Sequence, residues 1–273
     1  MIPAKFDYYR ADSADEAISL LGEHGEDAKL LAGGHSLLPL MKLRLATPSA
    51  LIDVGRLSDL SYVRDAGDHI AIGALTRHRD LQVSPVLATH VPVLAHVAGL
   101  VGDPQVRHRG TIGGSLAHGD PASDLPAVVL ALGGTLVARG PGGERQIDAG
   151  SFFRGFLETA LAPDELLVEI RVPKCEAGWS YQKFNRRAQD WAIVGAVATR
   201  YAGGTGVALV NMGPTPVRAA AVESALASGA GAAQAAEAAA EGTEPTDDLN
   251  ASPEYRRHLA RTLVRRALEE AGL

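Results

Sequence analysis

With 273 residues, 46% of them hydrophobic and 21% charged, the chain is long enough to bury one large domain or roughly two to three small ones. Its formal net charge of −6 argues against an electrostatic nucleic-acid binder. The single cysteine, Cys175, excludes an intrachain disulfide, and it excludes an iron–sulfur cluster held by this chain alone, since such a cluster needs about four cysteine ligands.

The first part of the chain predicts a helix, a strand and a glycine loop. Ser13-Ala14-Asp15-Glu16 has the spacing of a capping box that opens a helix, and Gly25 is a suitable end for it. Residues 28–31 follow as a short buried strand. The loop Ala32-Gly33-Gly34-His35-Ser36 connects this strand to a short helix over 37–45.

The middle of the chain alternates predicted strands and helices around a second glycine motif. In chain order we predict a strand (51–54), a hairpin (62–63 with 70–72), two helices (76–81 and 91–101), a polar loop (102–110), a glycine loop (Thr111-Ile112-Gly113-Gly114-Ser115), a helix begun by Asp124 (125–132) and two strands (135–138 and 167–172).

The composition shifts after Pro173, and we place the main domain boundary near 174–178. The last part predicts three antiparallel strands, an alanine-rich pair of helices and a final amphipathic helix, at 179–184, 192–201, 207–212, 219–240 and from Pro253 onwards. The first ten residues lack the apolar region of a signal peptide, and no apolar run reaches the roughly 18 residues of a membrane span. These features predict a cytoplasmic protein.

The first glycine loop has the composition of a phosphate site. Gly33 and Gly34 let the backbone approach a ligand, and exposed N–H groups beside the Ser36 hydroxyl suit a phosphate or pyrophosphate. On this loop alone, a plain tight turn is the better interpretation. The motif over 111–115 repeats two glycines between hydroxyl residues, so that two loops are available for the two phosphates of a dinucleotide.

Neither motif matches the common nucleotide fingerprints. Both lack the G-x-G-x-x-G spacing of Rossmann folds and the lysine of a Walker A loop, which disfavours NAD-dependent dehydrogenases and P-loop proteins. The run Gly34-His35-Ser36-Leu37-Leu38 lacks the second glycine of a hydrolase G-x-S-x-G elbow.

The two motifs stand in a longer pattern. Gln105 to Gly110 precedes the second motif, and His118-Gly119-Asp120-Pro121-Ala122-Ser123-Asp124-Leu125-Pro126 follows it. Further along, Lys183 through Arg187 leads to Asp190-Trp191-Ala192. In this order and spacing, the motifs resemble the flavoprotein subunit of the carbon monoxide dehydrogenase and xanthine dehydrogenase family, and the resemblance covers essentially the whole chain.

The resemblance implies an α+β protein that binds FAD in a fold similar to that of vanillyl-alcohol oxidase, the PCMH type. Residues 1–175 would form the FAD-binding domain, with two α/β subdomains at about 1–55 and 56–175. Residues 176–273 would form a C-terminal α+β domain with a three-stranded antiparallel sheet and a helical bundle.

The resemblance also implies the cofactor contacts. The two glycine motifs would hold the pyrophosphate and adjoining groups, and Val101 would lie along the cofactor. Asp124 would accept a hydrogen bond from FAD, Lys183 would reach the polar edge of the flavin, and Leu167 and Trp191 would lie near the ring system. The complete implied set is Leu30, Leu31, Ala32, Gly33, Gly34, His35, Ser36, Leu37, Val101, Thr111, Ile112, Gly113, Gly114, Ser115, Asp124, Leu167, Lys183 and Trp191.

Several of these residues have a purely structural alternative. Asp124 is equally placed to cap the helix that follows it, and both roles are compatible. Lys183 on a strand is otherwise a solvated surface residue, and Trp191 at a strand entrance is otherwise a core residue. His35 beside two glycines is a candidate general base. We favour the interpretation that it belongs to a loop that contacts the ligand through its backbone. We reject a metal site at His118, Asp120 and Asp124, because carboxylates in a turn beside a proline usually serve only to form the loop.

The predicted function is that of an electron-transfer flavoprotein with no catalytic side chain of its own. An iron–sulfur small subunit would pass electrons to FAD, a molybdopterin large subunit would oxidise the substrate, and the assembly would be a dimer of heterotrimers. The alternatives are a self-sufficient FAD-dependent oxidase or dehydrogenase and a nucleotide-binding module without redox turnover. The organic substrate and the final electron acceptor are not encoded in this chain.

Overall fold

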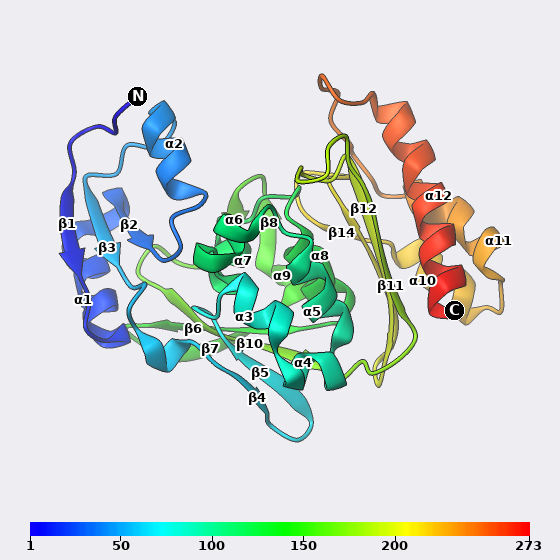
Figure 1. Cartoon of the computed structure of the whole chain (residues 1–273), viewed down its shortest axis with the longest axis horizontal. Helices are drawn as coiled ribbons and strands as arrows, with labels where there is room; N and C mark the ends of the chain where they lie inside the picture. Colours follow the sequence, from blue (N-terminus) through cyan, green and yellow to red (C-terminus); the bar gives the residue numbers. More distant parts are fainter.

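Three main β-sheets follow one another along the chain in the computed structural model, which describes residues 1–273 (Figure 1). In Figure 1 they run from the blue N-terminal sheet, through the central sheet beneath the green helices, to the yellow C-terminal sheet. None of the helices has the length and apolar character needed to cross a membrane.

The first sheet is parallel and has the order β1-β3-β2 (Asp7–Arg10, Ala50–Asp53 and Ala28–Leu31). The helix α1 (Ala14–His24) begins as predicted, because the Ser13 hydroxyl accepts a hydrogen bond from the Glu16 N–H at 3.1 Å. It ends at Gly25, whose φ of 68° is the left-handed conformation predicted for this stop. A single turn of 3-10 helix (Gly25–Asp27) leads into β2, and α2 (Leu37–Leu43) follows the glycine loop.

The central sheet is antiparallel and has the order β4-β5-β10-β6-β7 (Val63–Asp65, His69–Gly73, Leu166–Pro173, Thr135–Gly140 and Gly143–Asp148). Parallel strand pairing is therefore confined to the first sheet. A short 3-10 helix (Ser58–Leu60) precedes β4, and a two-stranded hairpin of β8 and β9 (Phe153–Gly155 and Glu158–Thr159) lies between β7 and β10 in the chain.

Both faces of the central sheet are buried. Ile70, Ile72 and Ile170 pack into the central core with the helices between β5 and β6, whereas Val137 and Val168 pack with α1 and the first sheet. A β-bulge between Leu167 and Glu169 shifts the register of β10 against β6. The central sheet thereby joins the two parts of the N-terminal half through apolar contacts on both of its sides.

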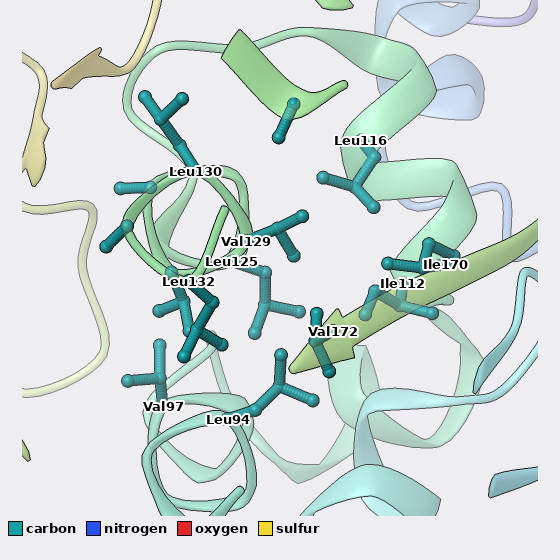
Figure 2. Close-up of a cluster of buried hydrophobic side chains, with 14 of the residues drawn as sticks. Leu94, Val97, Ile112, Leu116, Leu125, Val129, Leu130, Leu132, Ile170 and Val172 are labelled. Atoms are coloured by element: carbon teal, nitrogen blue, oxygen red, sulfur yellow. The ribbon is translucent and has the colours of Figure 1, made fainter. Parts of the chain in front are cut away.

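Seven helices accompany the central sheet: α3 (His78–Val83), α4 (Pro85–His90), α5 (Pro92–Gly99), α6 (Pro104–Arg109), α7 (Ile112–His118), α8 (Asp124–Ala131) and α9 (Ala149–Phe152). Every residue of α8 is buried. Figure 2 shows Leu125 and Val129 of α8 lying between Leu94 of α5 and Leu116 of α7. A helix that is apolar all round is buried on all sides, and α8 forms the centre of this core.

Two predictions for this region are wrong. Residues 102–110 are not a polar loop, because Pro104 to Arg109 forms α6. Residues 111–115 are not a free loop either, because the second glycine motif forms the start of α7. In each case a side chain caps the helix: Asp103 accepts from the Val106 N–H at 2.9 Å, and Thr111 accepts from the Gly114 N–H at 3.1 Å.

The C-terminal sheet is antiparallel, with the order β11-β12-β13-β14 (Trp179–Phe184, Val194–Tyr201, Gly204–Val210 and Val217–Arg218). The two-residue β14 extends the three predicted strands. One face of this sheet contacts α8 and the other contacts α12 (Pro253–Ala271), drawn in red in Figure 1. Two further helices, α10 (Ala220–Ala227) and α11 (Ala232–Ala236), and a 3-10 turn (Glu237–Ala240) pack beside α12.

Candidate functional site

A cavity of about 920 Å³ lies where the first glycine loop, the start of α7 and strands β10 and β11 meet. It is within the size range of small-molecule and cofactor sites. Every residue of the predicted FAD set except Ile112 lines this cavity. Residues separated by up to 161 positions, from Leu30 to Trp191, therefore line one cavity.

Ile112 is the exception, because it does not line the cavity. Its side chain is fully buried in the central core. In Figure 2 it lies beside Ile170 of β10 and points into the apolar cluster. Since Ile112 is the first residue of α7, the helical turn directs it to the side opposite its polar neighbours.

The first glycine loop presents unpaired backbone donors to the cavity. The N–H groups of four consecutive residues, Gly33 to Ser36, donate to no acceptor of the protein. Gly34 has a φ of 75°, a left-handed conformation that favours glycine and turns the chain at this point. A run of successive free N–H groups in such a turn forms a concave anion-binding nest.

The second glycine motif has the same residue types, but its N–H groups from Ile112 to Ser115 are bonded inside the protein, and only that of Thr111 donates to no acceptor there. The N–H of Ile112 donates to the carbonyl of Thr76, that of Gly113 to Ala74, and that of Ser115 to Thr111. The N–H of Gly114 is taken by the Thr111 hydroxyl. The Ser115 hydroxyl is half-buried, and it is the more exposed of the two hydroxyls in this motif.

Backbone packing brings the two motifs together. A Cβ atom on Gly33 would lie 2.3 Å from the Arg109 carbonyl oxygen and 2.8 Å from Cα of Gly110. A Cβ on Gly113 would similarly lie 2.6 Å from the Ala74 carbonyl oxygen. These glycines are therefore required by protein packing, whether or not they also make room for a ligand.

A buried ion pair borders the same cavity. The Lys183 ammonium lies 2.9 Å from a carboxylate oxygen of Asp124, and the two side chains are only 9% and 7% exposed. The Tyr181 hydroxyl donates to the other oxygen of Asp124, and Lys183 also donates to the Leu100 carbonyl at 3.3 Å. Burial raises the pKa of Asp124, while the neighbouring Lys183 charge and the Tyr181 hydrogen bond oppose that rise.

This arrangement decides between the functional and the purely structural interpretations of Asp124 and Lys183. Asp124 is the first residue of α8 and its carboxylate caps no backbone N–H, so the capping role is wrong. Lys183 is buried and paired, so it is not a solvated strand residue. Tyr181 was missed by sequence reasoning, although residues i and i+2 of a strand share one face and would have placed it beside Lys183. Burial raises the pKa of Tyr181 well above 10, which keeps its hydroxyl protonated as a donor.

The remaining predicted residues differ in exposure. Leu167 on β10 is buried at the cavity wall, and Val101 is partly buried, with its carbonyl accepting from Arg107 at 3.1 Å. Trp191 is 65% exposed, which excludes the alternative of a core tryptophan. His35 is exposed on the first loop. No cluster of three or more His, Cys, Asp or Glu side chains has the geometry to hold a metal ion.

An anion-binding nest and a buried charged pair in one large cavity define a protein that binds an extended polar cofactor. Residues 4–175 match the family model of the FAD binding domain in molybdopterin dehydrogenase, and residues 179–271 match that of the CO dehydrogenase flavoprotein C-terminal domain. The chain therefore belongs to the FAD-binding flavoproteins of the molybdopterin dehydrogenases, as its motifs predicted. FAD as the cofactor and the predicted fold class are both confirmed.

The similarity to individual relatives extends over the full chain. The carbon monoxide dehydrogenase medium chain of Hydrogenophaga pseudoflava is 45% identical, over 99% of this chain and 98% of its own length. The 6-hydroxypseudooxynicotine dehydrogenase complex subunit alpha of Paenarthrobacter nicotinovorans is 38% identical, over 99% and 96%.

Solved structures agree with this. A carbon monoxide dehydrogenase from Hydrogenophaga pseudoflava superimposes with a TM-score of 0.95 at 44% identity, covering 100% of this chain and 99% of that one. Quinoline 2-oxidoreductase from Pseudomonas putida 86 gives a TM-score of 0.92 at 33% identity, with the same coverage.

Proposed function

We propose that this chain is the electron-transfer subunit of a molybdenum hydroxylase and that its FAD lies in the 920 Å³ cavity. The bound flavin would supply the redox chemistry, while the protein supplies position and electrostatics. The observation that carries the placement is the run of four free N–H groups from Gly33 to Ser36 on the cavity wall. A pyrophosphate offers the negative charge that such a nest binds.

The other cavity residues have distinct proposed roles. Ser115, in the second motif, would donate a hydrogen bond from its hydroxyl to the same pyrophosphate. The buried pair of Lys183 and Asp124 would bind polar atoms of the cofactor, since both side chains border the cavity and still have hydrogen-bonding capacity. Leu167 would provide apolar contact, and the exposed Trp191 would lie at the rim near the ring system.

The rim also supports the proposal of partner subunits. A second cavity, of about 520 Å³, adjoins the first, and Asp190 and Trp191 line both. Phe156 in its wall is 68% exposed, so two large aromatic side chains are left uncovered at this mouth. Tryptophan, phenylalanine and arginine are enriched at protein interfaces.

The proposed assembly follows from the names of the relatives and from the chemistry of this chain. The relatives include a medium chain and a subunit of a dehydrogenase complex. Cys175 is buried and is the only thiol, so electrons would come from clusters on another chain. We propose an iron–sulfur small subunit and a molybdopterin large subunit as partners, in a dimer of heterotrimers. Within the chain, we propose a FAD-binding domain over 1–175, with subdomains at about 1–55 and 56–175, and a second domain over 176–273.

Flavin absorbance tests the electron-transfer role. In the complete complex, the organic substrate should bleach the flavin within the turnover time. The isolated chain loaded with FAD should keep its colour with the same substrate and lose it with dithionite. Rapid bleaching of the isolated chain by the substrate would support the self-sufficient oxidase instead, and a purified chain that takes up no FAD would support the nucleotide-binding module.

A further inference from the structure

We propose that His78 is a positioning residue of the cofactor site, which holds the Ser115 hydroxyl so that its hydrogen points to the bound pyrophosphate. His78 is not part of either glycine motif. The inference rests on the proposed placement of FAD, and it assigns this residue a role through Ser115 rather than a direct contact with the cofactor.

His78 lies directly behind the junction of the two motifs. Its side chain is 2% exposed and forms part of the cavity wall. Its backbone N–H donates to the Gly110 carbonyl at 3.0 Å, and a Cβ on Gly110 would lie 2.9 Å from the His78 Nε2 atom. Gly33 also packs against Gly110. The absence of side chains at these two glycines lets the first loop, the segment before the second motif and His78 pack together.

We assign the His78 ring the tautomer that carries its hydrogen on Nε2. The Nε2 atom lies 3.4 Å from the Ser115 hydroxyl oxygen, whereas the buried Nδ1 atom has no partner and is unpaired in either tautomer. With the hydrogen on Nε2, the ring donates to Ser115.

This tautomer fixes the role of the serine. A hydroxyl group has one hydrogen, and its oxygen can accept from other donors. Because the Ser115 oxygen accepts from His78, the serine hydrogen is free to donate into the cavity. With the opposite tautomer, Ser115 would donate to His78 and would present only lone pairs to a negatively charged phosphate.

The charge state of His78 is consistent with a single ring hydrogen. Burial, with smaller contributions from the positive charges of His35 and Arg107, lowers its pKa to about 4. The ring is therefore neutral at pH 7. A permanent cation is not needed here, because the four free amides of the first loop already provide donors.

Anion binding by the second motif depends on the orientation of a side-chain hydroxyl more than anion binding by the first motif does. All of the N–H groups from Ile112 to Ser115 are bonded within the protein, so apart from the N–H of Thr111 the motif offers only side chains to an anion. Thr111 is buried and its oxygen caps α7. Ser115 is the more exposed of the two hydroxyls in this motif, and in the proposed site its orientation depends on His78.

Isothermal titration of the apo chain with FAD and with riboflavin tests this role. The variants are Ser115→Ala, His78→Leu, the double variant, and the pair His78→Gln and His78→Asn. The glutamine amide reaches the position of Nε2 and keeps the donor, whereas the shorter asparagine does not. Urea unfolding of each apo variant checks the fold, and the Gln and Asn pair replaces His78→Leu if that variant does not fold.

We expect Ser115→Ala and His78→Leu each to weaken FAD binding by about tenfold, a typical loss for one hydrogen bond to a charged group. The double variant should bind FAD no more weakly than Ser115→Ala, because His78 acts through the serine. His78→Gln should recover most of the affinity and His78→Asn should not. Riboflavin, which lacks the phosphates, should bind all of the variants equally.

Different results would overturn either the proposed FAD site or the positioning role of His78. Unchanged FAD affinity in Ser115→Ala would remove the second motif from the proposed pyrophosphate site, and the role of His78 with it. If Ser115→Ala weakens binding but the losses multiply in the double variant, the site stands and the positioning role fails. An equal loss of riboflavin affinity, or no recovery in a folded His78→Gln variant, would assign His78 to the fold alone.

Discussion

The two glycine motifs contain the same residue types and differ in what they offer to a ligand. Gly33 to Ser36 form an irregular turn with four free N–H groups, whereas the motif at 111–115 forms the first turn of α7 and leaves only the N–H of Thr111 without an acceptor. The difference arises from Thr111, whose hydroxyl caps the helix, and from the contacts of α7 with residues 74 and 76. Two glycines beside a hydroxyl thus permit an anion site, but the surrounding hydrogen bonds decide how it binds.

The largest expected effect is at Gly33. In Gly33→Ala the new Cβ would collide with backbone atoms of Arg109 and Gly110, which cannot move without separating the two motifs. We expect a loss of roughly 3 kcal/mol or more in the free energy of unfolding, measured by urea denaturation of the apo chain. Gly114→Ala should lose less, because its Cβ meets only the Thr111 hydroxyl.

Gly22→Ala provides the control for that pair. Gly22 lies within α1 with nothing within 4 Å of its Cβ position, so this variant should be as stable as the native chain or slightly more so. If Gly33→Ala behaved like Gly22→Ala, the close backbone contact between the two motifs would not exist in solution.

The pH dependence of stability tests the buried, neutral state of His78 behind the junction of the two motifs. The pKa of His78 falls from 6.5 in the unfolded chain to about 4 in the folded one. Between these values the unfolded chain binds the proton and the folded chain does not, so stability is lost as the pH falls from 6.5 to 4. The loss should be about 3 kcal/mol, and it should be absent from His78→Gln in the same urea titrations. An identical pH profile in both proteins would contradict the buried, neutral state of His78.

The starts of α7 and α8 form a second comparison, since Thr111 caps its helix and Asp124 does not. A capping aspartate tolerates replacement by asparagine. Asp124→Asn should instead reduce the stability of the apo chain by about 2 kcal/mol, because it leaves the buried Lys183 without its counter-charge. Adding Lys183→Met should restore much of that stability. Wild-type stability in Asp124→Asn would argue against the ion pair.

The smallest expected effect on stability compares the hydroxyl residues that precede α7 and α2. Thr111→Ala removes the cap of α7 and should lower the free energy of unfolding by about 1 kcal/mol. Ser36 occupies the corresponding position before α2 but makes no side-chain capping bond, so Ser36→Ala should leave apo stability unchanged within about 0.5 kcal/mol. Equal losses in thermal denaturation would show that the two hydroxyls have the same structural role.

Several elements were determined by local sequence. The capping box at Ser13 set the start of α1, and Gly25 set its end. The predicted strands at 28–31 and 179–184 agree with β2 and β11 to the residue. These signals act within a few neighbouring residues, through a cap hydrogen bond, a left-handed glycine or an alternating pattern, so they are visible without the fold. The motif pattern likewise predicted the family, the cofactor and 17 of the 44 residues that line the cavity.

Only the tertiary structure decided which donors remain free. Whether the N–H of Gly113 is available depends on the Ala74 carbonyl, and whether Asp124 caps α8 depends on Tyr181 and Lys183 from a strand more than fifty residues later. His78 acquires its place behind Gly110 in the same way. Backbone hydrogen bonds and buried charges are satisfied by whichever groups the fold brings within about 3 Å, and sequence spacing does not specify those long-range partners.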